Sequence, residues 1–295
     1  MWVKQVMIHV FETKYASNPF LHAFVNKYDN IKYRNVETGI GEEFYRTIWP
    51  QFNPQKLNDG DEIAFQGIIR NTHLFKKYFN KHNWYYFDQP YFFATHYCKH
   101  PNFNDIWYRV IKSNTQKNYI DNDERHEMRF KQIYEKTTKE IKLQRWRKTG
   151  EHVLVIPPSY HTAKWYNLDR HEWEKNIVKE LKKHTDREIR VRHKYQNNID
   201  FGPRVNKSLL DDLTNCWAIV SWHSMCASEA VVRGVPSFCS QHSPAFPVSY
   251  GLEQLSKIEQ PKMPDREKWL YSLLGSQFTV SEMQSGFAYK YINGI

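Results

Sequence analysis

The 295-residue sequence lacks several patterns that mark common classes of protein. It contains no run of about 18 apolar residues, which a membrane-spanning helix needs. Its first stretch, MWVKQVMIHVFETK, has no charged segment followed by an apolar one, so no secretory signal is recognisable. The four cysteines show no CxxC spacing, which argues against a zinc ribbon or a disulfide scaffold. These absences predict a cytoplasmic protein without integral membrane association.

Several catalytic motifs are missing as well. There is no GxGxxG, GxxxxGK[ST], GxSxG or HExxH, so a simple dinucleotide dehydrogenase, a P-loop NTPase, a serine hydrolase and an HExxH zinc enzyme are unsupported. Two Asp-x-Asp pairs are present, Asp59 with Asp61 and Asp121 with Asp123. Such pairs can hold a divalent ion on nucleotide-sugar phosphates, but both suit turns or helix caps. The sequence therefore predicts no metal site and no cofactor.

Aromatic residues and basic charge are abundant. Ten Trp, 19 Tyr and 18 Phe can fill a substantial core, which excludes a disordered chain. The formal charge is 42 − 32 = +10, of which residues 1–150 carry 24 − 16 = +8 and residues 151–295 carry 18 − 16 = +2. A basic strip from Lys131 to Lys148 contributes net +5. This asymmetry favours a polyanionic partner for the first half, although a solvated helix end or an anionic lipid surface explains it too.

The order of predicted elements indicates an α/β protein. Strand-like segments fall at 3–11, 61–66 and 84–87 in the first half and at 151–156, 188–191, 216–221 and 235–239 in the second. Helix-like segments fall at 19–27, 71–80, 123–148, 171–183, 209–213 and 224–233. We expect two Rossmann-like domains, residues 1–150 and 151–295, with a cleft between them. A helix near the end of the tail, residues 265–292, could cross back to the first domain.

The most informative motif is VSWHSMCASEAVVRGVPSF, residues 220–238. A strand ends at Ser221, His223 and Ser224 occupy the turn, and a helix follows that carries Glu229. A helix N-terminus can bind phosphate through its N–H groups and its dipole, and a carboxylate on the helix can accept hydroxyls of a ribose. Taken singly, the serines also suit helix caps, Glu229 suits an ion pair with Arg233, and Gly234 suits a helix terminator.

This pattern, Ser followed by Glu-Ala and then Gly-x-Pro, resembles the donor-site element of GT-B glycosyltransferases. The segment Ile189 to Tyr195 is similar to a strand–His segment of capsule-type sugar transferases, although Lys194 stands where a proline is common. The layout also resembles phage-type enzymes that glycosylate hydroxylated bases of DNA. The resemblance implies a GT-B fold and a nucleotide-sugar donor. The donor-binding residues that it implies are Ser159, Tyr160, His161, His193, Lys194, His223, Ser224 and Glu229.

In such a fold the acceptor binds the first domain, and a carboxylate on a loop acts as the base. Asp88 follows the strand WYYF directly and is our candidate, although it also suits a turn before Pro90. Gln66 and Gln89 are expected to line the acceptor site. Lys142, Arg145 and Arg147 of the basic strip are expected to bind DNA.

The leading hypothesis is therefore a glycosyltransferase that moves a sugar from a nucleotide sugar to a hydroxyl of a modified pyrimidine in DNA. We expect a monomer in the cytoplasm, or in the host cytoplasm if a phage encodes it. One alternative is a sugar transferase for lipopolysaccharide or capsule at a membrane surface. Another is a basic DNA-binding protein without enzymatic activity. The sequence leaves open the sugar, the nucleotide and whether the anomeric configuration is inverted or retained.

Overall fold

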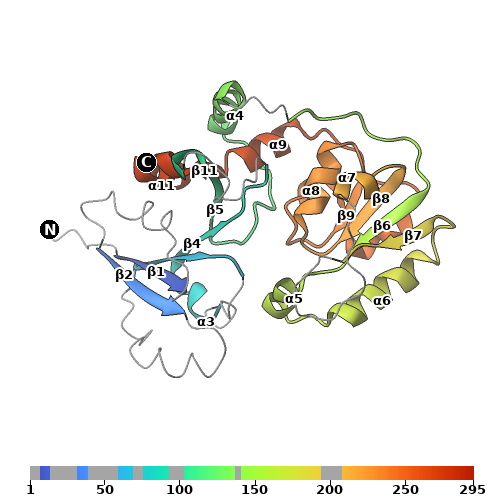
Figure 1. Cartoon of the computed structure of the whole chain (residues 1–295), viewed down its shortest axis with the longest axis horizontal. Coiled ribbons are helices and arrows are strands. Elements are labelled where there is room, and N and C mark those ends of the chain that lie inside the picture. The colour runs from blue at the N-terminus through green and yellow to red at the C-terminus, as the bar shows by residue number, and fades with distance from the viewer. Residues whose placement is uncertain are drawn as a thin grey trace. The chain divides into compact units, whose positions relative to one another are not determined.

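The computed structural model describes residues 7–13, 32–38, 59–68, 76–92, 103–136, 141–193 and 208–295. The chain forms two compact units, both drawn in Figure 1. Unit 1 combines Met1–Thr115 with Ser276–Ile295, and unit 2 is Gln116–Gly275. The chain thus passes from unit 1 into unit 2 and then returns to unit 1. This division falls earlier in the chain than the domain boundary that the sequence predicts after Gly150.

Unit 1 is built on a sheet that has six strands among the described residues. In chain order they are β1 (Met7–Thr13), β2 (Lys32–Thr38), β3 (Glu62–Gln66), β4 (Asn83–Asp88), β5 (Trp107–Lys112) and β11 (Gln277–Thr279). Their spatial order is β11-β5-β4-β3-β1-β2. The strands β1 to β4 run parallel, whereas β5 is antiparallel to β4 and β11 is antiparallel to β5. The predicted parallel α/β sheet is present, with an antiparallel edge that the sequence did not predict.

The C-terminal segment completes the core of unit 1. Helices α10 (Val280–Gln284) and α11 (Phe287–Asn293) follow β11 and lie beside this sheet in Figure 1. Phe278, Val280 and Met283 are fully buried in one cluster with Tyr85 and Phe87 of β4. Because β3 and β4 are apolar along most of their length, they need cover on both faces. The expected return of the tail to the first part of the chain is thus a packing requirement of that sheet.

Unit 2 contains a fully parallel sheet in its described residues. Its strands are β6 (His152–Ile156), β7 (Glu188–Val191), β8 (Cys216–Ser221), β9 (Ser237–Cys239) and β10 (Tyr250–Gly251). The spatial order is β10-β9-β8-β6-β7. From β6 the chain first adds β7 on one side and then β8 on the other. The direction of winding therefore reverses between β6 and β8.

Helices cover both faces of this sheet. On one face, α6 (Arg170–Leu181) and the 3₁₀ segment η7 (Leu252–Lys257) pack on Val153, Val155 and Phe238. On the other face, α7 (Leu209–Asp212) and α8 (Met225–Val232) pack on residues such as Leu154 and Ile219. The strands β6 and β8 are buried at every position. This double cover explains why both strands are almost entirely apolar in the sequence.

The helix predicted over residues 123–148 is wrong over residues 141–148. Helix α4 spans Glu124–Lys136, and residues 141–150, here called the strap, are not helical. The strap pairs with the end of α8 instead: Gln144 N donates to Val232 O at 2.9 Å, and Arg147 N donates to Gly234 O at 2.8 Å. These backbone bonds connect segments that lie far apart in the sequence, so helix propensity could not reveal them.

Gly234 allows this close approach. Its φ is +77°, and a Cβ atom at this position would collide with the carbonyl oxygen of Arg145 in the strap. A residue with a side chain would be strained twice, by its backbone conformation and by a contact with backbone that cannot rotate away. Gly234, which the sequence predicts to end the helix, thus also allows the strap to pack closely against it.

We expect Gly234→Ala to lower the free energy of unfolding by more than the ~1 kcal/mol that a positive φ alone costs. Gly294→Ala is the matched control, because Gly294 has φ +69° but lies exposed after α11. Urea denaturation of both variants measures the difference. If both variants lose the same free energy of unfolding, the contact between Gly234 and the strap does not contribute to stability.

Candidate functional site

The reversal between β6 and β8 sets the location of the candidate site in unit 2. Parallel α/β sheets bind ligands at the carboxyl ends of the strands where the winding reverses. Ile156, the last residue of β6, is paired with Ser221, the last residue of β8. The segment after β6 leads through Ser159 into α5 (Tyr160–Tyr166), and the segment after β8 leads through His223 into α8. Five predicted donor residues, Ser159, Tyr160, His161, His223 and Ser224, therefore follow two neighbouring strand ends.

Ser159 and Ser224 begin their helices as N-caps. Ser159 Oγ accepts a hydrogen bond from Thr162 N at 3.2 Å, and Ser224 Oγ accepts one from Cys226 N at 3.2 Å. Each hydroxyl thus stabilises a helix start, as the simpler interpretation of the sequence requires. The cap at Ser224 also fixes the positive end of the α8 dipole beside Ser221, where a phosphate group would be stabilised.

Three buried polar atoms near this turn have no hydrogen-bond partner among the described residues. They are the hydroxyls of Ser221 and Ser228 and the indole nitrogen of Trp222. Ser221 is 0% exposed and Ser228 is 1% exposed. Burial of an unpaired hydroxyl is unfavourable, and such groups recur at functional sites. The turn between β8 and α8 therefore offers hydrogen-bonding capacity that the described protein groups do not use.

Aromatic rings gather at the same edge of the sheet. The ring of Tyr166, at the end of α5, lies 5.4 Å from the ring of His223 and 4.5 Å from that of His242, between ring centroids. Trp222 lies 6.0 Å from Tyr166. The sequence analysis predicted His223 but missed the three other rings. The sequence signal that could have indicated Trp222 is its position directly after an apolar strand.

Arg170 is a second residue that the sequence analysis missed. It is the first residue of α6, and its Nε donates to Pro158 O at 2.9 Å, which fixes the segment after β6. Burial lowers the pKa of its guanidinium. One turn later, Glu174 Oε2 lies 2.7 Å from Nε2 of the predicted donor residue His193. His193 therefore has a carboxylate partner just after β7.

The remaining donor predictions are less informative. Glu229 is exposed on α8, and its carboxylate lies 3.7 Å from Arg233, the ordinary i,i+4 pair. Its role toward a ribose stays a prediction. Lys194 lies outside the described residues.

In unit 1, Gln66 and Asp88 end neighbouring parallel strands. Gln66 of β3 is paired with Phe87 of β4, and Asp88 directly follows Phe87. The side chains of Gln66 and Asp88 therefore both belong to the carboxyl edge of this sheet. Asp88 is not isolated there. Its Oδ2 accepts from Arg109 Nη2 at 2.8 Å and from Tyr86 OH at 2.5 Å, and its Oδ1 accepts from Gln89 N at 2.8 Å. Its role as a base stays a prediction.

The basic strip does not form one helical face. Arg147 donates to the backbone carbonyl oxygens of Leu213 and Cys216, so its guanidinium stabilises unit 2. Its expected DNA contact stays a prediction, although these bonds already occupy part of its guanidinium. Lys142 and Arg145 are exposed on the strap, and their expected DNA contacts stay predictions.

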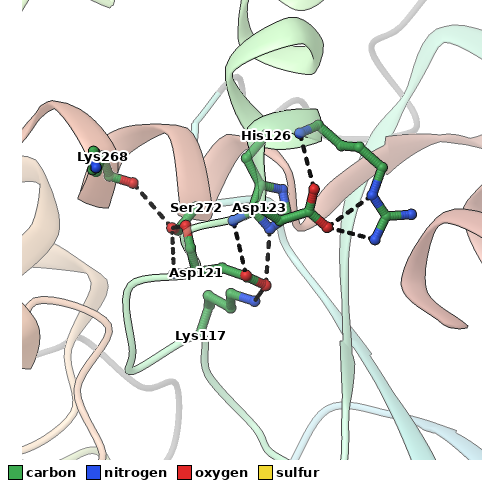
Figure 2. A network of polar contacts seen from close by, with 7 residues as sticks. Lys117, Asp121, Asp123, His126, Lys268 and Ser272 are labelled. Carbon is green, nitrogen blue, oxygen red and sulfur yellow. Dashed lines mark hydrogen bonds and ion pairs between the residues drawn. The ribbon is translucent and has the colours of Figure 1, made fainter. Parts of the chain in front are cut away.

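The pair Asp121 and Asp123 lies in a network with basic side chains, shown in Figure 2. Asp121 Oδ2 lies 3.1 Å from Lys117 Nζ and 3.0 Å from His126 Nε2, and Asp123 Oδ2 accepts from Arg125 Nε at 2.7 Å. The main chain of Asp121 is also bonded to Ser272 Oγ of α9 (Glu267–Leu274). These contacts give the aspartates a structural role. In the part of the chain that is described, no cluster of three or more His, Cys, Asp or Glu could hold a metal ion.

Comparisons with known proteins give a distant likeness. No protein-family model matches the chain, and no curated protein matches it. The solved structure of Thermosulfurimonas dismutans KpsC, beta Kdo 2,7 transferase, is 11% identical over 97% of this chain and 98% of that chain, with a TM-score of 0.45. The KpsC beta Kdo 2,4 transferase of the same organism is 12% identical over 92% of this chain and 91% of that chain, with a TM-score of 0.47. Similarity at this level does not establish a shared fold or activity.

No helix among the described residues is long and apolar enough to cross a membrane.

The Asp121 network predicts a dependence of stability on pH. Burial alone would raise the pKa of Asp121, but its hydrogen bond with His126 and the charge of Lys117 outweigh burial and lower the pKa from 3.8 to about 2. A lowered pKa in the folded state contributes stability above the unfolded value, and that stability is lost as pH falls from about 4 toward 2. We expect Asp121→Asn to be less stable than wild type at pH 6, with a difference that shrinks across this window.

Urea denaturation at a series of pH values measures this difference. Asp186→Asn, at an exposed position of unit 2, controls for the loss of one acidic group. A difference for Asp121→Asn that stays constant between pH 4 and pH 2 would contradict the assignment.

Proposed function

We propose that the chain is a glycosyltransferase that uses a nucleotide sugar as donor and binds it at the turn between β8 and α8 of unit 2. One observation carries this proposal: a fully parallel sheet, covered on both faces, reverses its winding beside a serine-capped helix and a buried Ser221 hydroxyl that has no partner among the described residues. The helix start suits a phosphate, and the nearby rings of Tyr166, Trp222 and His242 suit the flat face of a base. The sequence pattern of Ser, then Glu-Ala, then Gly-x-Pro supports the same assignment.

The proposed reaction is a single displacement. Asp88 of unit 1 takes the proton of the acceptor hydroxyl, and the hydroxyl oxygen forms a bond with the anomeric carbon. The bond from that carbon to the phosphate oxygen breaks, and its electron pair leaves with the nucleotide. The α8 N-terminus stabilises the charge that develops on this phosphate. Such a displacement inverts the anomeric configuration.

We propose a saccharide of the capsule or lipopolysaccharide type as the acceptor. The case for DNA is weaker than the sequence implied, because the basic strip is divided between a helix and the strap and because Arg147 is bonded to backbone carbonyls. A modified pyrimidine in DNA stays the second candidate, since Lys142, Arg145 and Lys148 leave exposed positive charge on the strap.

Turnover distinguishes these acceptors. The purified chain is incubated with a panel of nucleotide sugars and with a capsule-type oligosaccharide or duplex DNA that contains 5-hydroxymethylpyrimidine, and the product masses are measured. We expect nucleotide release and a gain of one sugar mass on the oligosaccharide, abolished by Asp88→Asn. A gain on DNA would support the second candidate. No binding of any nucleotide sugar would contradict the proposed function.

Ser221→Ala tests the donor site separately from folding. Because the Ser221 hydroxyl has no partner in the described protein, its removal should not lower the free energy of unfolding, whereas the affinity for the nucleotide sugar should fall roughly tenfold. The control is Ser249→Ala: this buried hydroxyl is bonded to Ser237 Oγ at 3.0 Å and to Ala245 O at 2.7 Å. Its removal should lower stability and leave affinity unchanged. Calorimetric titration and thermal denaturation give the two readouts.

A further inference from the structure

Arg109 lies opposite Asp88 in the sheet of unit 1. It belongs to β5, is paired in register with Asp88 of the antiparallel β4, and is only 3% exposed. A charged residue within the apolar strand WYRVIK needs a partner, because burial of an unpaired guanidinium is strongly unfavourable. Its Nη2 donates to Asp88 Oδ2 at 2.8 Å, which supplies that partner.

The guanidinium also holds the chain that follows Asp88. Arg109 Nη1 donates to Gln89 O at 2.6 Å, so the two bonds fix the carboxylate and the next peptide group together. The rings of Tyr86 and Tyr91 lie 5.5 and 5.3 Å from the guanidinium carbon. Burial alone lowers the pKa of Arg109, but the charge of Asp88, together with electrostatic interactions with these tyrosines, outweighs burial and raises the pKa. Arg109 therefore remains a cation throughout the physiological range.

The C-terminal strand β11 fixes two further residues of the chain that follows Asp88. Gln277 is fully buried, and its Oε1 accepts from Tyr91 N at 3.0 Å and from Phe92 N at 3.2 Å. The loop after β4 is thus held by two residues that come from β5 and from the distant tail.

The two oxygens of Asp88 have different surroundings. Oδ2 accepts from both Arg109 and Tyr86, and burial together with the charge of Asp88 raises the pKa of Tyr86, so its hydroxyl keeps its proton and donates. Within the described part of the chain, Oδ1 accepts one bond, from Gln89 N. The side chain of Asp88 is 30% exposed. Oδ1 is therefore the oxygen with capacity for a further proton.

We propose that Arg109 is a positioning residue of the transferase: with Tyr86 it holds Oδ2 of Asp88, so that Oδ1 receives the proton of the acceptor hydroxyl. This inference rests on the proposed function. A misplaced catalytic group costs about a hundredfold in rate when it moves by about 1 Å. Arg109 should therefore act on kcat and not on the binding of the donor, which we assign to unit 2.

Arg109→Met and Arg109→Lys test this role in the full chain. We expect Arg109→Met to lower kcat about a hundredfold, with the donor Kd unchanged in calorimetric titration. Arg109→Lys keeps the charge but loses the planar fork, so it should recover part of kcat. Tyr86→Phe removes one buried hydroxyl and should lower kcat by roughly tenfold while preserving the fold. Tyr86→Phe therefore still tests the positioning of Asp88 if an Arg109 variant does not fold.

Arg187→Lys is the matched control. Arg187 of unit 2 also binds a carboxylate, Glu259, at 2.9 Å and lies over an aromatic ring, that of Trp217, at 4.5 Å. We expect this variant to lose thermal stability and to keep kcat. If the Arg109 and Tyr86 variants fold and keep kcat, as the control does, Arg109 is not a positioning residue. The proposed transferase activity would be unaffected by that result. Wild type that releases no nucleotide would instead overturn the proposed function, and with it this role of Arg109.

Discussion

The architecture of unit 2 depends on the burial of parallel strands on both faces. Parallel neighbours cannot be joined by tight turns, so each connection passes through a helix or a long segment that covers one face of the sheet. Every segment that follows a strand then begins at the same edge. In unit 2 this constraint brings the residues after β6 and those after β8 together, because Ile156 and Ser221 are paired. The candidate donor site is a consequence of this topology, and the serine caps and aromatic rings give it its chemistry.

Unit 1 depends on a different interaction, the ion pair between Asp88 and the buried Arg109. A guanidinium placed in an apolar strand is stable only if a carboxylate accompanies it, and the register of β4 and β5 supplies one directly opposite. The same pair organises the loop after β4, together with Gln277 of the C-terminal strand. The tail thus contributes both apolar cover for the sheet and a polar contact for the residues that follow the proposed base.

Local patterns predicted much of unit 2, because several local preferences agree there. The apolar run 216–221, the cap at Ser224 and the terminator at Gly234 each specify the same strand–turn–helix, and the structure has β8 and α8 at these residues. The helix over 123–148 failed because the strap bonds to Val232 and Gly234, far along the sequence. β5 and β11 were missed for a similar reason. Their pairing joins residues 107–109 to residues 277–279, and short strands of this kind gain stability from partners that the sequence does not reveal.

The site residues likewise divide into those that local sequence patterns predict and those that depend on contacts with distant elements. Ser159, His223 and Ser224 were predictable since they directly follow apolar strands, whereas Arg109, Arg170 and Tyr166 owe their positions to contacts with other elements. The central claim is that a nucleotide sugar binds where the winding of unit 2 reverses. Hydrogen–deuterium exchange of the intact chain, with and without a saturating nucleotide sugar, tests it most directly. The account predicts protection of backbone amides in residues 157–164 and 221–228. Protection confined to unit 1, or none at saturation, would contradict it.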